Sequence, residues 1–123
     1  MLKQGGGNIV NTSSVCGLRG DVNNTGAYIA SKHGVIGLAK AAALEYAKAG
    51  IRVNVICPGA IHTPMLESSM AALPDLSEVI KHHIPMGRAG TPEEIAGTAV
   101  WLCSDAASYV TGQSIVIDGG LIA

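Results

Sequence analysis

The stretch IRVNVICPG, residues Ile51 to Gly59, decides the fold class of this chain. Its branched apolar residues form a short run that ends at Pro58-Gly59, which is typical of a strand buried on both faces. Gly50 stands immediately before the run, and glycine is the usual residue just after a helix. We therefore expect this strand to follow directly on a helix.

That helix is expected to run from about Gly26 to Ala49, with Asn24 or Thr25 able to cap its first turn. Before it, residues 8–11 form a short β-prone run that continues into a polar loop. Strand, helix and strand make a βαβ unit, whose two strands pair in parallel through a right-handed crossover. The sequence thus predicts an α/β domain on a parallel sheet.

The connection over residues 60–90 is long and irregular, with short helices expected near 64–72 and 75–82. Flexible apolar side chains here favour a mobile lid over an apolar ligand, although they could equally fill a core: Met65, Met70 and Met86. A further helix begins cleanly, with Thr91 as its cap and Pro92 at its first position. Residues 114–117 form the last strand.

Composition excludes several classes of function. Hydrophobic residues make up 48% of the 123 residues, charged residues only 14%, and the net charge is −1. Without a basic run or an apolar stretch of membrane-spanning length, we expect no nucleic-acid partner and no membrane partner. The chain also begins without a signal-peptide core, so we expect a cytoplasmic, globular protein.

The cysteine and histidine residues give little sign of a metal site. Cys16, Cys57 and Cys103 are odd in number and far apart, so we interpret them as buried thiols in a reducing compartment. His82 and His83 are adjacent and would point in different directions, with no third ligand at a suitable spacing. We predict neither a disulfide nor a metal site.

The long helix is nearly free of charge. Its formal charges between positions 26 and 49 are Lys32, Lys40, Glu45 and Lys48. Such a helix has too little polar surface to face water along a whole side, so a second protein element should cover it. Dimerisation through this helix is the simplest cover and predicts a homo-oligomer, although a missing part of the same chain could also supply it.

Chemistry-bearing residues follow the strands at one edge of the expected sheet. In open parallel sheets, ligands bind beyond the carboxyl ends of the strands. The residues expected there are Ser13 and Ser14 after the first strand, Pro58, Gly59, Ile61 and Thr63 after the second, and Tyr28 and Lys32 in the first turns of the helix. A serine, a phenol and an ammonium group then converge on one site.

Tyr28 and Lys32 lie one helical turn apart on one face. Alone, this spacing is common and would describe a surface helix with an extended lysine. A free tyrosine has a pKa near 10, so a tyrosine base at neutral pH needs up to about 4 kcal/mol of phenolate stabilisation. A fixed cation one turn away can supply part of that energy, which gives the pair a catalytic interpretation.

At this point the chain resembles the short-chain dehydrogenase/reductase family. The matching segments, in family order and spacing, are IVNTSS at 9–14, YIASK at 28–32, IRVNVICPGAIHTP at 51–64, PMGRAGTPEEIA at 85–96 and GQSIVIDGG at 112–120. The resemblance implies a Rossmann-like doubly wound parallel sheet, of which residues 1–123 form the C-terminal half. It also implies NAD or NADP as the cofactor, without deciding between them.

The resemblance assigns roles to individual residues. Tyr28 would be the catalytic acid/base, and Lys32 would bind the nicotinamide ribose hydroxyls and lower the tyrosine pKa. Ser14 would hydrogen-bond the substrate oxygen, while Ser13 would merely end the strand. Around the nicotinamide, the resemblance implies contacts from a further set: Pro58, Gly59 and Ile61 beside the ring, and Thr63 at its carboxamide or at the pyrophosphate.

The chain departs from the family pattern in its first half. Family members are about twice as long and carry a glycine-rich phosphate turn, a residue that selects NAD or NADP, and an active-site asparagine. Gly5 to Gly7 cannot replace that turn, because this cluster precedes a strand instead of leading from a strand into a helix. We therefore keep two readings open: an oxidoreductase, and a truncated, inactive chain or assembly module with an open sheet edge at residues 9–11.

A flavodoxin-like or other nucleotide-binding module would share the βαβ pattern but leaves the serine, tyrosine and lysine together unexplained. For an enzyme, the resemblance implies a small secondary alcohol or ketone as substrate, with similarity greatest to members that oxidise cyclic and other secondary alcohols. Members that reduce 3-oxoacyl thioesters or oxidise sugars share much of the same sequence. The methionines of residues 60–90 favour an apolar substrate.

Overall fold

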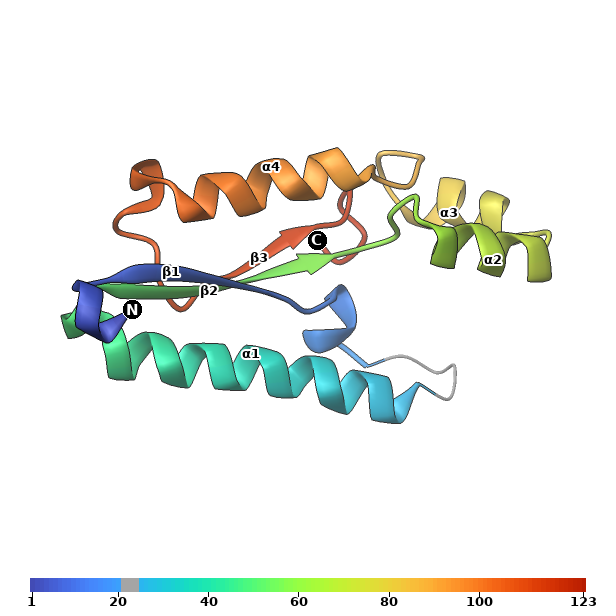
Figure 1. Ribbon diagram of the computed structural model, residues 1–123. Coiled ribbons are helices and arrows are strands. Elements are labelled where there is room, and N and C mark those ends of the chain that lie inside the picture. Colours follow the sequence, from blue (N-terminus) through green and yellow to red (C-terminus); the bar gives the residue numbers. More distant parts are fainter. Residues whose placement is uncertain (21–24) are drawn as a thin grey trace.

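The fold is a parallel three-stranded sheet with α1 against one face and α4 against the other (Figure 1). It is seen in a computed structural model that describes residues 1–20 and 25–123. The strands are β1 (Gly7–Thr12), β2 (Ile51–Pro58) and β3 (Ser114–Ile117), and the helices are α1 (Gly26–Tyr46), α2 (Pro64–Ala72), α3 (Leu76–His83) and α4 (Pro92–Cys103). The predicted α/β class, with three parallel strands and flanking helices, is confirmed.

Strand β2 occupies the centre of the sheet, in the order β1-β2-β3. One of its faces contributes Ile51, Val53, Val55 and Cys57 to the main core, which α1 completes with Ile36, Ala39 and Ala43. Because successive side chains alternate between the faces of a strand, the other face carries the intervening residues. Burial against α1 explains the apolar residues Ile51, Val53 and Val55, while Arg52 and Asn54 on the other face form hydrogen bonds to residues 104–113.

The strand register brings the functional ends of β1 and β2 to one edge. Thr12 of β1 pairs with Ile56 of β2, and the amide of Ser13 donates a hydrogen bond to the Ile56 carbonyl at 2.9 Å. The chain therefore leaves β1 beside the point where β2 ends at Pro58. Within the part of the chain that the structure describes, β1 lies at an edge of the sheet.

The long helix differs in detail from its prediction. Its α-helical part ends at Tyr46, and residues 47–49 continue as a tighter 3-10 turn that Gly50 closes in the left-handed conformation, at φ 73°. Thr25 stands at the cap position, but its side chain makes no capping hydrogen bond, so the predicted Thr25 cap is wrong. Its backbone is not in the extended conformation typical of a capping residue. The alternative cap, Asn24, lies outside the described residues.

The later helices follow the predicted pattern. Helix α2 covers the predicted range, and α3 begins one residue later than predicted. Helix α4 is capped by Thr91, whose hydroxyl accepts from the Glu94 amide, while the Glu94 side chain accepts from the Thr91 amide. With Pro92 as the first helical residue, this reciprocal pair of bonds fixes where α4 begins.

The prediction of three buried thiols is wrong for two of them. Cys57 on β2 is fully buried, whereas Cys16 is half-buried and Cys103 is exposed at the end of α4. Over residues 1–20 and 25–123, no group of three histidine, cysteine or acidic side chains is arranged to hold a metal ion. No helix of that described part is long and apolar enough to cross a membrane.

Asn54 is a buried polar residue in the centre of the sheet, only 1% exposed. Its Nδ2 donates to the Val110 carbonyl at 2.9 Å, and its Oδ1 accepts from the Gln113 amide at 3.0 Å. Together these bonds fix the segment that leads into β3.

Replacing Asn54 by alanine is expected to lower the free energy of unfolding by about 2–4 kcal/mol, because two backbone groups lose their partners. Asn8→Ala is the matched control, since the Asn8 side chain makes one exposed bond, to the Cys103 carbonyl at 2.9 Å. That variant should lose less than about 1 kcal/mol. Urea denaturation of both variants measures the difference, and equal losses would show that the Asn54 bonds contribute nothing beyond ordinary surface bonds.

Candidate active site

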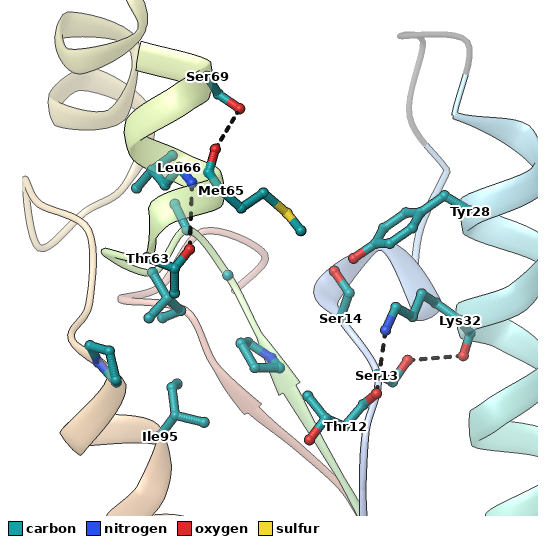
Figure 2. Close-up of a pocket in the computed structure, with 15 residues that line it drawn as sticks. Thr12, Ser13, Ser14, Tyr28, Lys32, Thr63, Met65, Leu66, Ser69 and Ile95 are labelled. Atoms are coloured by element: carbon teal, nitrogen blue, oxygen red, sulfur yellow. Dashed lines mark hydrogen bonds between the residues drawn. The ribbon is translucent and has the colours of Figure 1, made fainter. Parts of the chain in front are cut away.

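A pocket of about 520 Å³ opens at the carboxyl edge of the sheet (Figure 2). All the site residues predicted from sequence line it: Ser14, Tyr28, Lys32, Pro58, Gly59, Ile61 and Thr63. They come from three separate segments, namely the end of β1, the start of α1 and the chain that follows β2. The fold therefore brings together residues up to 49 positions apart in the sequence.

The serine pair after β1 has two separate tasks. Ser13 is buried, and its hydroxyl donates to the Lys32 carbonyl at 2.9 Å, which ties α1 to the end of β1. Ser14 is extended, and its Oγ accepts from the Cys16 amide at 3.2 Å. Since that bond uses a lone pair of Ser14, its hydroxyl hydrogen is free to point into the pocket. Ser13 does more than end a strand, because it anchors α1.

Tyr28 and Lys32 project from α1 toward the pocket beside Ser14 (Figure 2). Tyr28 is half-exposed, and the Lys32 Nζ atom lies 5.4 Å from the centroid of its ring. The same Nζ donates to the Thr12 carbonyl at 3.4 Å, which directs the lysine toward the end of β1. An ammonium group with three donors retains two for a bound ligand.

The segment that follows β2 forms one wall of the pocket. Gly59 lies so close to Asp118 that an added Cβ atom would come within 2.8 Å of the Asp118 Cβ, so glycine is required there. Ile61 forms an isolated parallel bridge with Gly90. Thr63 caps α2, and its Oγ1 accepts from the Leu66 amide at 3.4 Å. Both ends of this wall are thus fixed by neighbouring elements.

The side of the pocket that faces Tyr28 and Lys32 contains further residues, of which the sequence indicated only Met65, as part of the expected lid (Figure 2). They come from α2 and α4: Met65, Leu66, Ser69, Pro92 and Ile95. Met65 is 81% exposed and reaches over the opening, so it does not fill a core. Helical spacing and capping locate α2 and α4 in the sequence, but no local pattern reports that Ile95 faces Tyr28 across a cavity.

Cys57 is the next-to-last residue of β2 and is buried in the main core. Burial raises the pKa of its thiol, and hydrogen bonds from the Ser14 backbone and the Ser13 side chain oppose this effect only partly. The thiol is therefore neutral near pH 7 and is no candidate nucleophile. The groups available for proton transfer in the pocket are hydroxyl and ammonium groups.

Behind the Ile61 wall, Arg88 and Glu94 form a two-point ion pair. The Nη2–Oε1 distance is 2.7 Å and the Nη1–Oε2 distance is 2.9 Å. Hydrogen bonds from Arg88 and from the Thr91 amide lower the pKa of the Glu94 carboxyl group to about 2. Because this folded-state pKa is depressed, the pair stabilises the fold above pH 4.5, and the contribution is lost as the pH falls toward 2.

A carbon-13 NMR titration of the side-chain carboxyl groups tests this assignment. The Glu94 carboxyl carbon should titrate with a midpoint near 2. In the Arg88→Met variant the midpoint should move up toward the ordinary glutamate value, because the hydrogen bonds from the guanidinium, the main cause of the low pKa, have been removed. An unchanged midpoint in Arg88→Met would show that the carboxylate does not depend on the guanidinium.

Known proteins are similar in sequence to this chain. A family model described as enoyl-(acyl carrier protein) reductase matches residues 1–122. Cyclohexanol dehydrogenase of Acinetobacter sp. is 51% identical over 97% of this chain and 45% of its own length. The 3-oxoacyl-[acyl-carrier-protein] reductase of Thermotoga maritima is 51% identical over 99% of this chain and 48% of its own.

The chain belongs to the short-chain dehydrogenase/reductase family. The resemblance inferred from the sequence motifs is therefore confirmed, and the names of these relatives describe oxidoreductases. The chain spans about half the length of the curated relatives it matches.

Solved structures of the family share the fold. A candidate 2-deoxy-D-gluconate 3-dehydrogenase of Agrobacterium tumefaciens with bound NADP has a TM-score of 0.91 at 43% identity, covering 98% of this chain and 49% of its own. A 7α-hydroxysteroid dehydrogenase complexed with NADH and a 7-oxo bile acid has a TM-score of 0.91 at 38% identity, covering 98% and 46%. The Rossmann-like character of the sheet, predicted from the motifs, is confirmed by these neighbours.

Proposed function

We propose that this chain forms the catalytic half of an NAD(P)-dependent oxidoreductase that interconverts a secondary alcohol and a ketone. The observation that supports it best is the convergence of Ser14, Tyr28 and Lys32 with residues 58–63 around one pocket. A hydroxyl, a phenol and an ammonium group beside an apolar wall are suited to proton transfer coupled to hydride transfer.

In the oxidative direction, Tyr28 as the phenolate accepts the hydroxyl proton of the alcohol. Ser14 donates a hydrogen bond to the same substrate oxygen, and the Lys32 ammonium stabilises the negative charge on the tyrosine oxygen. A nicotinamide bound in the pocket would supply the acceptor for the hydride from the carbinol carbon. Tyr28 would be left protonated as the substrate becomes the ketone.

The pocket residues fit the nicotinamide-ribose end of the cofactor. Lys32 retains two donors for the ribose hydroxyls after its bond to the Thr12 carbonyl. Pro58, Gly59 and Ile61 offer an apolar surface with an exposed backbone on which a flat ring can lie. Thr63 keeps its hydroxyl hydrogen for the carboxamide, because its capping bond uses a lone pair.

The diphosphate end has no such site in the described residues near this pocket. The cluster from Gly5 to Gly7 lies at the amino end of β1, whereas the pocket lies at the carboxyl end, roughly 20 Å away along the strand. This separation supports the second candidate function, an inactive chain or assembly module that retains the catalytic residues without binding a cofactor.

The pocket lining favours an apolar substrate. Met65, Leu66 and Ile95 face the space next to Tyr28, and Ser69 adds one hydroxyl group. We propose that α2, within the lid expected over residues 60–90, encloses a cyclic or other apolar secondary alcohol. A 3-oxoacyl thioester or a sugar is the alternative substrate, and neither NAD nor NADP is preferred by any residue of the pocket.

We further propose that the chain assembles into a homo-oligomer through α1. Leu38 and Leu44 are 72% and 84% exposed on the outer side of this helix. Gly34 and Ala41 lie on the same side and would allow close approach of a second helix. Covering these residues removes apolar surface from water, which is the main driving force of such association.

The first experiment is a titration of the 123-residue chain with NADH and with NADPH, following cofactor fluorescence, with sedimentation analysis of the same samples. Saturable binding supports the oxidoreductase. A screen of cyclohexanol, a 3-oxoacyl thioester and gluconate as substrate classes then follows. Absence of binding up to millimolar cofactor supports the inactive chain.

A chimera separates loss of the cofactor half from loss of catalytic competence. The part of the Acinetobacter cyclohexanol dehydrogenase that this chain does not match is joined to the chain, and cyclohexanol oxidation is measured with NAD and NADP. Turnover by the chimera would show that the 123 residues are catalytically competent. A folded chimera that binds cofactor without turnover would contradict the assignment of Tyr28 and Ser14.

A further inference from the structure

A connected set of hydrogen bonds locks the turn at residues 88–91 to the start of α4. Besides its two bonds to Glu94, Arg88 donates from Nη1 to the Ala89 carbonyl at 3.0 Å. The Oε2 atom of Glu94 also accepts from the Thr91 amide at 2.8 Å. The guanidinium plane and the carboxylate together fix the conformation of this turn.

The locked turn is bonded directly to the wall of the pocket. The Gly90 carbonyl accepts from the His62 amide at 2.9 Å, and the Gly90 amide donates to the Ala60 carbonyl at 2.9 Å. Gly90 is confined between Ile61 of the wall and Glu94 of α4. A Cβ atom there would lie 2.9 Å from the Ile61 Cδ1 atom and 3.3 Å from the Glu94 Oε2 atom.

The wall has space behind it into which it could move. A small cavity of about 100 Å³ lies between the wall and the C-terminal segment, and its lining includes Ile61, Arg88, Glu94 and Asp118. The two backbone hydrogen bonds to Gly90 hold the wall at residues 60–62 away from this space. They can do so only if Gly90 itself is held in place. Helix α4 carries Ile95, which lines both the main pocket and this small cavity, so the same lock also sets the position of Ile95.

We propose that Arg88 and Glu94 are positioning residues that set Ile61 and Ile95 against the cofactor and substrate; this inference rests on the proposed function. Neither residue lines the main pocket, so both act through the Gly90 turn. Their side chains are 48% and 44% exposed, and exposed ion pairs contribute little to global stability. A positioning role therefore predicts a local effect at the wall that is larger than the effect on unfolding.

The variants are Arg88→Met, Glu94→Gln and Arg88→Lys, with Lys81→Met as the matched control. Lys81 forms an ion pair with Glu78 at 2.7 Å on α3, with side chains 60% and 59% exposed, and it lies outside the pocket. Amide hydrogen exchange is measured at His62 and Gly90, with the Val55 amide of β2 as the core reference. Cofactor dissociation constants are measured on the same samples.

Exchange at His62 and Gly90 should be about tenfold faster in Arg88→Met and in Glu94→Gln, while exchange at Val55 changes less than about twofold. Arg88→Lys should give an intermediate increase, because lysine keeps the charge without the two-point geometry. The dissociation constant for NADH or NADPH should rise about 3- to 10-fold in step with the exchange rates. Lys81→Met should change none of these quantities.

Unchanged exchange at His62 and Gly90, or an equal acceleration at Val55, would overturn the inference without touching the proposed function. Faster exchange with an unchanged cofactor affinity would also overturn it. If the unaltered chain binds neither cofactor, the proposed function fails for this chain, and binding is then measured in the chimera with the same four substitutions. Weaker binding only in the Arg88 and Glu94 variants of the chimera supports the inference.

Discussion

Replacing Tyr28 by phenylalanine is expected to lower turnover about 10²–10⁴-fold while leaving cofactor affinity within about twofold. The substitution removes only the hydroxyl group, so the ring that lies 5.4 Å from Lys32 Nζ remains in place. Without that hydroxyl, the one α1 side chain left in the pocket is Lys32, which as an ammonium group cannot accept the proton of the alcohol. Turnover and cofactor binding are measured separately, on the chain if it is active and otherwise on the chimera.

Tyr109→Phe is the matched control for this experiment. Tyr109 is fully exposed and does not line the main pocket, so the loss of its hydroxyl group should leave turnover unchanged. Thermal unfolding of both variants should agree with that of the unaltered chain. Retained turnover in Tyr28→Phe would remove Tyr28 from the proton step and leave the oxidoreductase proposal without its acid/base.

Replacing Lys32 by alanine is expected to lower kcat/KM about 10²-fold, divided between weaker cofactor binding and slower proton transfer. The Nζ atom lies near the Tyr28 ring, and its bond to Thr12 directs its remaining donors into the pocket. Loss of the cation removes stabilisation of the phenolate together with a hydrogen-bond donor to the ribose.

The readouts for Lys32→Ala are the cofactor dissociation constant and kcat. The dissociation constant should rise because the ribose loses a donor, and kcat should fall because the phenolate loses its neighbouring positive charge. Lys40→Ala, at an exposed position further along α1, should change neither quantity. If Lys32→Ala altered only the free energy of unfolding, the lysine would be structural. Residues 28 and 32 would then be part of an ordinary surface helix with an extended lysine.

Local sequence was enough for much of the fold. The run from Ile51 to Pro58 carries branched apolar residues because β2 is buried, so a buried parallel strand could be predicted from it, although its central place in the sheet was not. Thr91, Pro92 and Glu94 fix the start of α4 by hydrogen bonds within four residues, and such bonds can be read from sequence. The cap at Thr25 was predicted on the same grounds but failed, because residue type favours a cap without fixing the backbone conformation.

The candidate site was predictable in part, for a related reason. Parallel strands bring their carboxyl ends to one edge, so Ser14, Tyr28 and Lys32 could be expected together without knowledge of the packing. The half-buried position of Cys16 and the exposed position of Cys103 could not be predicted, since they depend on which side of each element packs against the rest of the chain. The same holds for Ile95, whose position across the pocket depends on how α4 lies over the sheet.

The sequence by itself determined the order of elements, the parallel sheet, the family and the residues that converge at its carboxyl edge. The family was inferred from the resemblance of the sequence motifs, whereas the elements, the sheet and the converging residues follow from periodicity, capping and connection length, which are properties of neighbouring residues. Only the tertiary structure decided that Ser13 anchors α1 and that Arg88 and Glu94 fix the wall containing Ile61. Such contacts join residues from separate segments, and their existence depends on distances and directions that the folded backbone alone supplies.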